Sequence, residues 1–188
     1  MGKIVFIGDS LTKGTDYGGV TASDTFAYKI GTANGYAPAD ILRKGVSSDT
    51  AYGVLNRIQA DVIDHAPDVC ALMIGVNDWW TGTTMANFET SLSAISAAVR
   101  GAGIKLIVIT SNFQRGSGAQ ISAQEQYVRK TEAMPNDGIV DVFREMTTRG
   151  LTGDYMQYFA DIVHFSKAGH SYVAEVAARA KHAGFFLP

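Results

Sequence analysis

A short apolar run that ends in a hydroxyl constrains the fold of this chain more than any other feature. Residues 3–11 read Lys-Ile-Val-Phe-Ile-Gly-Asp-Ser-Leu, and their apolar, β-branched part is typical of a buried strand in a parallel sheet. Gly8, Asp9 and Ser10 follow that strand directly. Taken alone, Ser10 at this place is as compatible with a helix cap as with a nucleophile. The partners that the rest of the chain supplies decide between the two interpretations.

Alternating strand and helix patterns cover the rest of the chain. Apolar runs predict strands at residues 3–8, 39–46, 69–75, 104–110 and 139–142, and helical periodicity predicts helices at about 25–33, 51–62, 85–100, 122–134 and 167–183. Polar loops are expected at residues 9–24 and 111–122, and another loop is expected between the end of the third strand and residue 85. Residues 143–160 are expected to form a short helix and an aromatic loop.

This alternation predicts a single α/β domain over residues 1–188. No long linker, low-complexity tract or internal repeat interrupts it, and 188 residues are enough to bury one core. Right-handed crossovers place helices on both faces of a five-stranded parallel sheet, which gives a three-layer α/β/α architecture. Ligands bind such sheets outside the carboxyl ends of the strands. The loops after the first three strands should therefore meet at one edge.

Composition excludes several classes of partner. The formal net charge is -2 and the basic residues are scattered, so we expect neither nucleic acid nor an anionic membrane as a partner. No apolar stretch is long enough to span a membrane, and the N-terminus does not resemble a signal peptide. The localisation stays open between the cytoplasm, taken by default, and a domain excised from a secreted or particle-associated protein.

The cysteine and histidine pattern predicts no metal site. Cys70 lies inside an apolar run and is expected to be a buried, inert thiol. The histidines lack the spacing of zinc motifs. His65 and His182 are expected near helix ends, where each meets the helix dipole. His170 is expected to be a structural neighbour of His164.

The residues that follow the strands suggest nucleophilic catalysis. A serine hydroxyl needs a base within hydrogen-bond reach, and His164 is the best candidate for that base of Ser10. Asp161, three residues earlier, can accept a hydrogen bond from the other imidazole nitrogen. The order Ser, Asp, His resembles that of α/β-hydrolases, but their Gly-x-Ser-x-Gly elbow is absent. Residues 8–15 also fail to match the phosphate-binding P-loop pattern, because Lys13 stands where its second glycine belongs.

Four short blocks, taken together, resemble the motifs of the SGNH hydrolases, also called the GDSL family. In chain order they are Gly8-Asp9-Ser10-Leu11, Gly45, Gly75-Val76-Asn77-Asp78 and Asp161-Ile162-Val163-His164. The resemblance implies a flavodoxin-like architecture and a serine esterase that needs no cofactor. It also implies an oxyanion hole made of the backbone N–H groups of Ser10 and Gly45 and the side-chain amide of Asn77. These assignments are physically sensible, because glycine permits close backbone approach and a carboxamide donates without titrating.

The second block departs from the family pattern. Arg43 stands where the family often has asparagine, and Ser48 stands where it often has a second glycine. We expect these departures to change the loop path or a substrate contact rather than to abolish activity. Asp9 and Asp78 are expected to brace the loops through hydrogen bonds to neighbouring amides.

The substrate is less well determined by the sequence. Asp9, Trp79 and Trp80 are candidate substrate-binding residues, since the tryptophans follow Asn77 closely and could stack on a sugar or wall an acyl pocket. Equally, the tryptophans could pack against the next helix. The aromatic residues Tyr155, Tyr158 and Phe159 could form the opposite wall or belong to the core.

The sequence therefore predicts a carboxylic ester hydrolase acting on a short-acyl ester by way of an acyl-enzyme. Carbohydrate O-deacetylation is the favoured reaction, with a small-molecule or glycan ester as substrate. The alternatives are a lipase, lysophospholipase or thioesterase, and a non-catalytic carbohydrate-binding or structural module that keeps the fold. The oligomeric state stays open.

Overall fold

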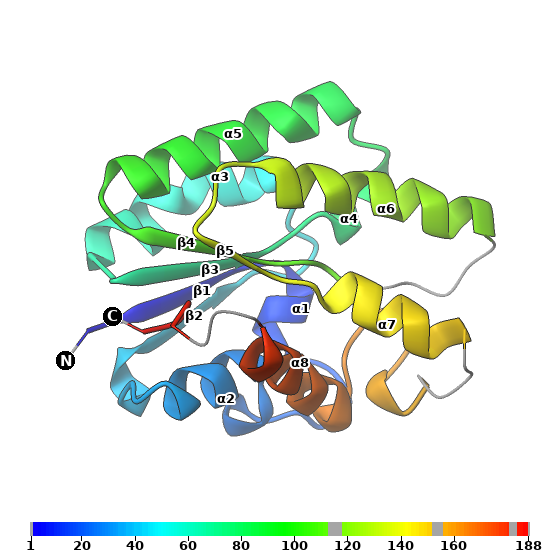
Figure 1. Ribbon diagram of the computed structural model, residues 1–188, viewed down its shortest axis with the longest axis horizontal. Coiled ribbons are helices and arrows are strands. Elements are labelled where there is room, and N and C mark those ends of the chain that lie inside the picture. The colour runs from blue at the N-terminus through cyan, green and yellow to red at the C-terminus, as the bar shows by residue number, and fades with distance from the viewer. Residues whose placement is uncertain (1, 113–117, 152–155, 181–183, 188) are drawn as a thin grey trace.

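Five parallel strands form the centre of the protein, and helices cover both faces of the sheet (Figure 1). The computed structural model describes residues 2–112, 118–151, 156–180 and 184–187. The strands are β1 (Ile4–Gly8), β2 (Ile41–Gly45), β3 (Val69–Met73), β4 (Lys105–Ile109) and β5 (Gly138–Val140), in the spatial order β2-β1-β3-β4-β5. This order is the flavodoxin-like one. The predicted α/β class and five-stranded parallel sheet are confirmed.

The helices form a layer on each side of the sheet. Figure 1 shows α3 (Ala51–Asp61), α5 (Met85–Gly101) and α6 (Gly118–Ala133) on one side, and α2 (Phe26–Ala33), α7 (Val142–Leu151) and α8 (Lys167–Arg179) on the other. Two short helices, α1 (Ser10–Lys13) and α4 (Val76–Thr81), follow β1 and β3, and 3-10 turns cover Ala22–Asp24, Pro38–Asp40, Ile63–His65 and Met156–Tyr158. None of the described helices is long and apolar enough to cross a membrane.

The core lies on both faces of β1, which explains the continuous apolar run at the N-terminus. All five residues of this strand are buried. Successive side chains of a strand point to opposite faces, so Ile4 and Phe6 pack towards α2 and α8. Val5 and Ile7 pack towards α3 and α5.

Two predicted loops begin as helices. The polar segment after β1 starts with α1, because the Asp9 side chain accepts the Leu11 N–H at 2.9 Å and caps this helical turn. The segment after β3 continues directly as α4, because Gly75 adopts a φ of 118° and turns the chain from strand to helix. These turns place the two polar motifs at helix starts rather than in irregular loops.

Other boundaries differ from the prediction by a few residues. The second strand begins only after a 3-10 turn, at Ile41, and α6 begins at Gly118, inside the predicted loop 111–122, of which residues 113–117 lie outside the described residues. The predicted short helix after β5 spans ten residues, as α7. The last helix ends at Arg179 rather than 183, and residues 181–183 are not among those described.

The strand order brings three loops to one edge of the sheet. Strand β1 lies between β2 and β3, and the chain passes from β1 to β2 on one side but from β3 to β4 on the other, so the connections after these two neighbouring strands run in opposite directions. Gly8 is in register with both Gly45 and Met73. The segments that begin at Asp9, Val46 and Ile74 therefore start side by side, at the switch point where such sheets bind ligands.

Candidate active site

Ser10 lies at the first position of α1, directly behind the carboxyl end of β1. The residue is only 5% exposed, and its hydroxyl Oγ lies 3.0 Å from Nε2 of His164. These two residues are 154 positions apart in the chain. The structure thus brings the predicted nucleophile within hydrogen-bond reach of the predicted base.

A tight loop before α8 presents His164 to Ser10. An isolated antiparallel bridge between Phe159 and Phe165 closes the loop, and the Ala160 N–H donates to the His164 carbonyl at 2.8 Å. Phe165 is buried and anchors the loop in the core. The base of the loop is thereby fixed to the fold although its tip is exposed.

Asp161 orients the imidazole from within the same loop. Its Oδ2 lies 2.8 Å from Nδ1 of His164, and its Oδ1 accepts the backbone N–H groups of Val163 and His164 at 2.7 Å each. Burial raises the pKa of Asp161, but hydrogen bonds from the His164 amide, the His164 ring and the Val163 amide outweigh it and hold the pKa below 3.8. The carboxylate is therefore ionised at neutral pH and can accept a hydrogen bond from Nδ1–H of His164 without taking the proton.

Two further residues contact this loop and were not predicted from the sequence. The ring of Tyr17 stacks on the imidazole of His164, with ring centroids 3.3 Å apart and planes 7° from parallel. The carboxamide of Asn112, just after β4, donates to the Val163 carbonyl. Asn112 follows the end of a strand, a position at which site residues are expected, so the sequence could have indicated it. Tyr17 lies in a glycine-rich loop, where nothing in the sequence indicates a contact with His164.

Gly45 ends β2 against the backbone of α1. A Cβ built on Gly45 would lie 2.1 Å from the Lys13 nitrogen and 2.6 Å from the Lys13 Cα. Only glycine therefore allows this close approach. The contact brings the end of β2 next to the helical turn that carries Ser10.

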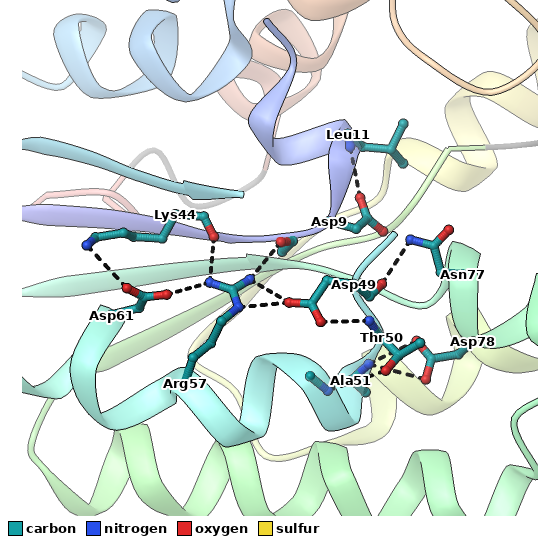
Figure 2. Close-up of polar contacts among 12 residues, drawn as sticks. Asp9, Leu11, Lys44, Asp49, Thr50, Ala51, Arg57, Asp61, Asn77 and Asp78 are labelled. Atoms are coloured by element: carbon teal, nitrogen blue, oxygen red, sulfur yellow. Dashed lines mark hydrogen bonds and ion pairs between the residues drawn. The ribbon is translucent and has the colours of Figure 1, made fainter. Parts of the chain in front are cut away.

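Asn77 lies in the first turn of α4, and its side chain is held in place by a backbone group. Its Nδ2 donates to the Asp49 carbonyl at 2.8 Å (Figure 2). A carboxamide carries two N–H donors, so this bond engages one of them and fixes the direction of the other. Ser10, Gly45 and Asn77 thus lie on three segments that start at the same edge of the sheet.

Asp9 of the first motif block and Asp78 of the third accept hydrogen bonds from backbone amides next to the site. Asp78 accepts the Ala51 N–H at 3.0 and 3.2 Å with its two oxygens, and burial followed by the Asp49 charge raises the pKa of Asp78 to about 6. Asp9 is completely buried. Its side chain does not reach the surface and caps α1, which argues against the predicted substrate contact of Asp9.

The departures in the second block have a simple structural counterpart. Ser48 adopts a φ of 63°, in the left-handed region that favours glycine. The serine therefore takes the backbone conformation that a glycine would take there, at the cost of some strain, which argues against a changed loop path at this position. Arg43 lies within β2, in register with Phe6 of β1.

Trp79 and Trp80 occupy α4, within one turn of Asn77. Trp79 is half-buried, Trp80 is 64% exposed, and the two rings meet edge to face with centroids 5.7 Å apart. On the other side, Tyr158 stacks on Tyr172 and Phe159 packs on Phe165, so both belong with the core. Tyr155 lies outside the described residues.

The remaining histidines stand apart from this chemistry. His170 is buried and accepts the Phe26 N–H at 3.3 Å, and burial lowers the pKa of His170 to about 4. His65 ends a 3-10 turn, and His182 falls outside the described residues. Within the described part of the chain, no three His, Cys, Asp or Glu side chains are grouped to hold a metal ion.

Comparison with known proteins gives the family. The sequence model of the GDSL-like lipase/acylhydrolase family matches residues 6–172. The chain belongs to that family. All four motif blocks of the candidate site fall inside the matched range.

Other members of the GDSL-like family share the sequence in part and the fold almost throughout. An acetylxylan esterase of Geobacillus stearothermophilus is 33% identical over 88 residues, an alignment that spans 42% of this chain and 40% of that enzyme. A crystal structure of a catalytic mutant of Axe2, an acetylxylan esterase from the same organism, has a TM-score of 0.78 at 22% identity, covering 95% of this chain and 93% of that one. A putative lipolytic protein of the G-D-S-L family from Desulfitobacterium hafniense has a TM-score of 0.73 at 20% identity, covering 95% and 99%.

Proposed function

We propose that this protein is a serine esterase that removes short acyl groups, acetyl above all, from a carbohydrate. The observation that carries the proposal is the continuous contact from Ser10 Oγ through the His164 ring to Asp161, at 3.0 and 2.8 Å. Membership of an acylhydrolase family supports the reaction class. That all five strands belong to one sheet supports a single hydrolase domain over residues 1–188.

In the first half of the reaction, Ser10 Oγ attacks the ester carbonyl carbon. The Oγ proton moves to His164 Nε2, and Asp161 stabilises the resulting imidazolium through Nδ1. The negative charge that develops on the carbonyl oxygen is stabilised by the N–H groups of Ser10 and Gly45 and by the Asn77 amide. When the carbon–oxygen bond breaks, His164 returns its proton to the leaving alcohol, and the acyl group stays on Ser10.

In the second half, water replaces the alcohol. His164 takes a proton from a water molecule, whose oxygen attacks the acyl carbon, and the same donors stabilise the second oxyanion. Collapse of this intermediate releases the carboxylic acid, and the proton on His164 returns to Ser10. Every proton is thus accounted for by groups of this chain and by water.

The carbohydrate assignment is supported by two independent observations. Exposed aromatic rings stand on two elements that flank the site, with Trp80 on α4 and Tyr52 on α3 each 64% exposed. Flat aromatic faces with a polar tip suit the face of a sugar ring. In addition, the curated relative that matches part of this sequence is an acetylxylan esterase.

Activity and acyl preference can be tested with p-nitrophenyl esters of increasing chain length. We expect turnover of the acetate, a fall with longer chains, and none in Ser10→Ala. A clear preference for long chains would favour a lipase or lysophospholipase instead. No turnover by the wild type would favour a non-catalytic module, and undiminished turnover by Ser10→Ala would overturn the assignment of Ser10 as the nucleophile.

The sugar assignment requires a comparison of two substrates in one variant. Trp80→Ala should lower kcat/KM for acetate release from acetylated xylo-oligosaccharides, while its kcat/KM on p-nitrophenyl acetate, which has no sugar, should stay near that of the wild type. Equal losses on both substrates would instead indicate damage to the site, and equal retention would remove Trp80 from sugar binding.

The oxyanion role of Asn77 has a kinetic signature of its own. Asn77→Ala should lower kcat by roughly 10²-fold or more and leave KM almost unchanged, because the amide acts on charge that exists only in the transition state. Steady-state kinetics on p-nitrophenyl acetate measure both constants. A raised KM with an unchanged kcat is incompatible with the role.

A further inference from the structure

Arg57 of α3 points its guanidinium at the carboxyl ends of β1 and β2, behind the candidate oxyanion hole. Figure 2 shows the group surrounded by backbone carbonyls and two carboxylates. Its side chain is 18% exposed, and it lies outside the four motif blocks of the sequence. The sequence pattern alone assigned it no role.

The first contact fixes the peptide that carries one proposed oxyanion donor. Arg57 Nη1 donates to the Lys44 carbonyl at 2.8 Å. The carbonyl of Lys44 and the N–H of Gly45 belong to the same planar, trans peptide unit and point in opposite directions. Holding the carbonyl oxygen therefore sets the direction in which the Gly45 N–H points.

The second contact ties this peptide to the strand that leads to the nucleophile. Arg57 Nη2 donates to the Gly8 carbonyl at 2.9 Å, and the same oxygen accepts the Val46 N–H at 3.0 Å. Gly8 stands two residues before Ser10. One rigid, planar group thus spans the ends of β1 and β2.

The third contact reaches the proposed side-chain donor through one intermediary. Arg57 Nε and Nη2 both lie 2.8 Å from Oδ2 of Asp49, and the backbone carbonyl of Asp49 accepts Nδ2 of Asn77 at 2.8 Å. On its other side Arg57 Nη1 donates to Asp61 Oδ2 at 2.7 Å. Asp49 thereby links the guanidinium to the Asn77 carboxamide.

We propose that Arg57 is a positioning residue for the oxyanion hole. It holds the Lys44–Gly45 peptide directly and the Asn77 carboxamide through Asp49, so two of the three proposed donors are oriented by one side chain. Guanidinium suits this task because its five donors lie in a fixed plane, whereas the lysine ammonium is a flexible point charge. The inference rests on the proposed esterase function.

The kinetic test uses Arg57→Lys, which keeps the charge but cannot span the four acceptors, namely the carbonyls of Gly8 and Lys44 and the carboxylates of Asp49 and Asp61. We expect kcat on p-nitrophenyl acetate to fall on the order of 10- to 10²-fold, the range produced by misplacing a catalytic group by about 1 Å. KM should change little, because these donors act on charge that develops in the transition state. The matched control is Arg100→Lys on α5, whose partner Asp137 lies 3.2 Å away before β5, and which should leave both constants unchanged.

Coupling to Asn77 separates positioning from a purely structural contribution. If Arg57 acts partly through Asn77, then Arg57→Lys should lower kcat by a smaller factor in an Asn77→Ala background than in the wild type. If the two substitutions acted independently, Arg57→Lys would lower kcat by the same factor in both backgrounds. Guanidinium chloride, at concentrations that leave the fold intact, should partly restore kcat of Arg57→Ala, with sodium chloride as the control.

A crystal structure of Arg57→Lys gives a readout that does not depend on turnover. We expect the Gly45 peptide and the Asn77 carboxamide to move relative to the wild type while the sheet stays unchanged. If the wild type lacks esterase activity but these groups move, the proposed function fails and the positioning contact stands. Unchanged positions together with a near-wild-type kcat in Arg57→Lys would overturn the proposal.

Discussion

Replacing Asp9 by asparagine should change how the stability of this protein depends on pH. The Asp9 side chain is completely buried, its Oδ1 accepts the Leu11 N–H at 2.9 Å, and no described residue is a partner for its Oδ2. Burial raises the pKa of Asp9 from 3.8 to about 7, and the charges of Asp78 and Asp49 add to this effect. The hydrogen bond from the Leu11 N–H opposes it. Above that pH the folded protein holds a buried carboxylate anion next to the nucleophile.

The sign of the effect follows from proton linkage. Between pH 3.8 and about 7 the folded state binds the Asp9 proton and the unfolded state does not, so this contribution to stability is lost as the pH rises through 7. At about 1.4 kcal/mol per pH unit, the displaced pKa corresponds to at most roughly 4 kcal/mol, of which roughly 2 to 3 kcal/mol is lost between pH 5 and pH 8. Asparagine keeps the capping oxygen but cannot ionise.

The measurement is urea unfolding of wild type and Asp9→Asn at several pH values from 5 to 8. The free energy of unfolding of the variant, relative to that of the wild type, should rise by roughly 2 to 3 kcal/mol across this range. Two other buried groups also make stability depend on pH in this range. Burial raises the pKa of Asp78 to about 6, so the contribution of Asp78 to the stability of the protein falls as the pH rises. Burial lowers the pKa of His170 to about 4, so the contribution of His170 increases as the pH rises. Both groups are present in each protein: His170 cancels in the difference, and Asp78 cancels except for its repulsion with Asp9, which is already part of the raised Asp9 pKa.

A matched control is the same replacement at an exposed carboxylate. Asp64→Asn removes an exposed carboxylate and keeps the bond that Gln59 Nε2 makes to Oδ1 of residue 64, 2.7 Å long in the wild type, so it should not reproduce the rise that burial causes in Asp9→Asn. If the Asp9→Asn difference is flat, or shrinks with rising pH, the reasoning from burial is refuted.

Two further predictions concern groups that contact the site. Gly45→Ala should lower kcat by roughly 10²-fold, because the new Cβ would lie 2.1 Å from the Lys13 backbone nitrogen and must push the end of β2 away from α1. Kinetics on p-nitrophenyl acetate measure this change, and a kcat equal to that of the wild type would contradict it. Tyr17→Leu should lower kcat/KM by roughly 2- to 30-fold, the equivalent of the 0.5 to 2 kcal/mol that an aromatic face contributes to a stacked cation, here the imidazolium of His164. Tyr17→Phe keeps the ring and should stay near wild type, so an equal loss in both variants would rule out the stacking role.

The sequence by itself determined the class of fold and showed that the polar motif residues lie at the ends of strands. The apolar, β-branched run before Gly8 favoured a strand buried on both faces, and strand-helix alternation predicted a parallel sheet whose strands end at one shared edge. Ser10, Gly45 and Asn77 each follow or end such a strand, so their convergence followed from topology. Periodicity and strand ends are local properties, and they can be read from neighbouring residues.

Tertiary structure decided what each side chain touches. Arg57 lies 49 residues from Gly8 and 13 from Lys44, and Tyr17 reaches His164 across most of the chain. Such contacts depend on how α3 and the loops pack on the sheet, which no local pattern encodes. The same reason separates Asp9, which is predicted to contact substrate but is completely buried, from its neighbour Ser10, whose hydroxyl reaches His164.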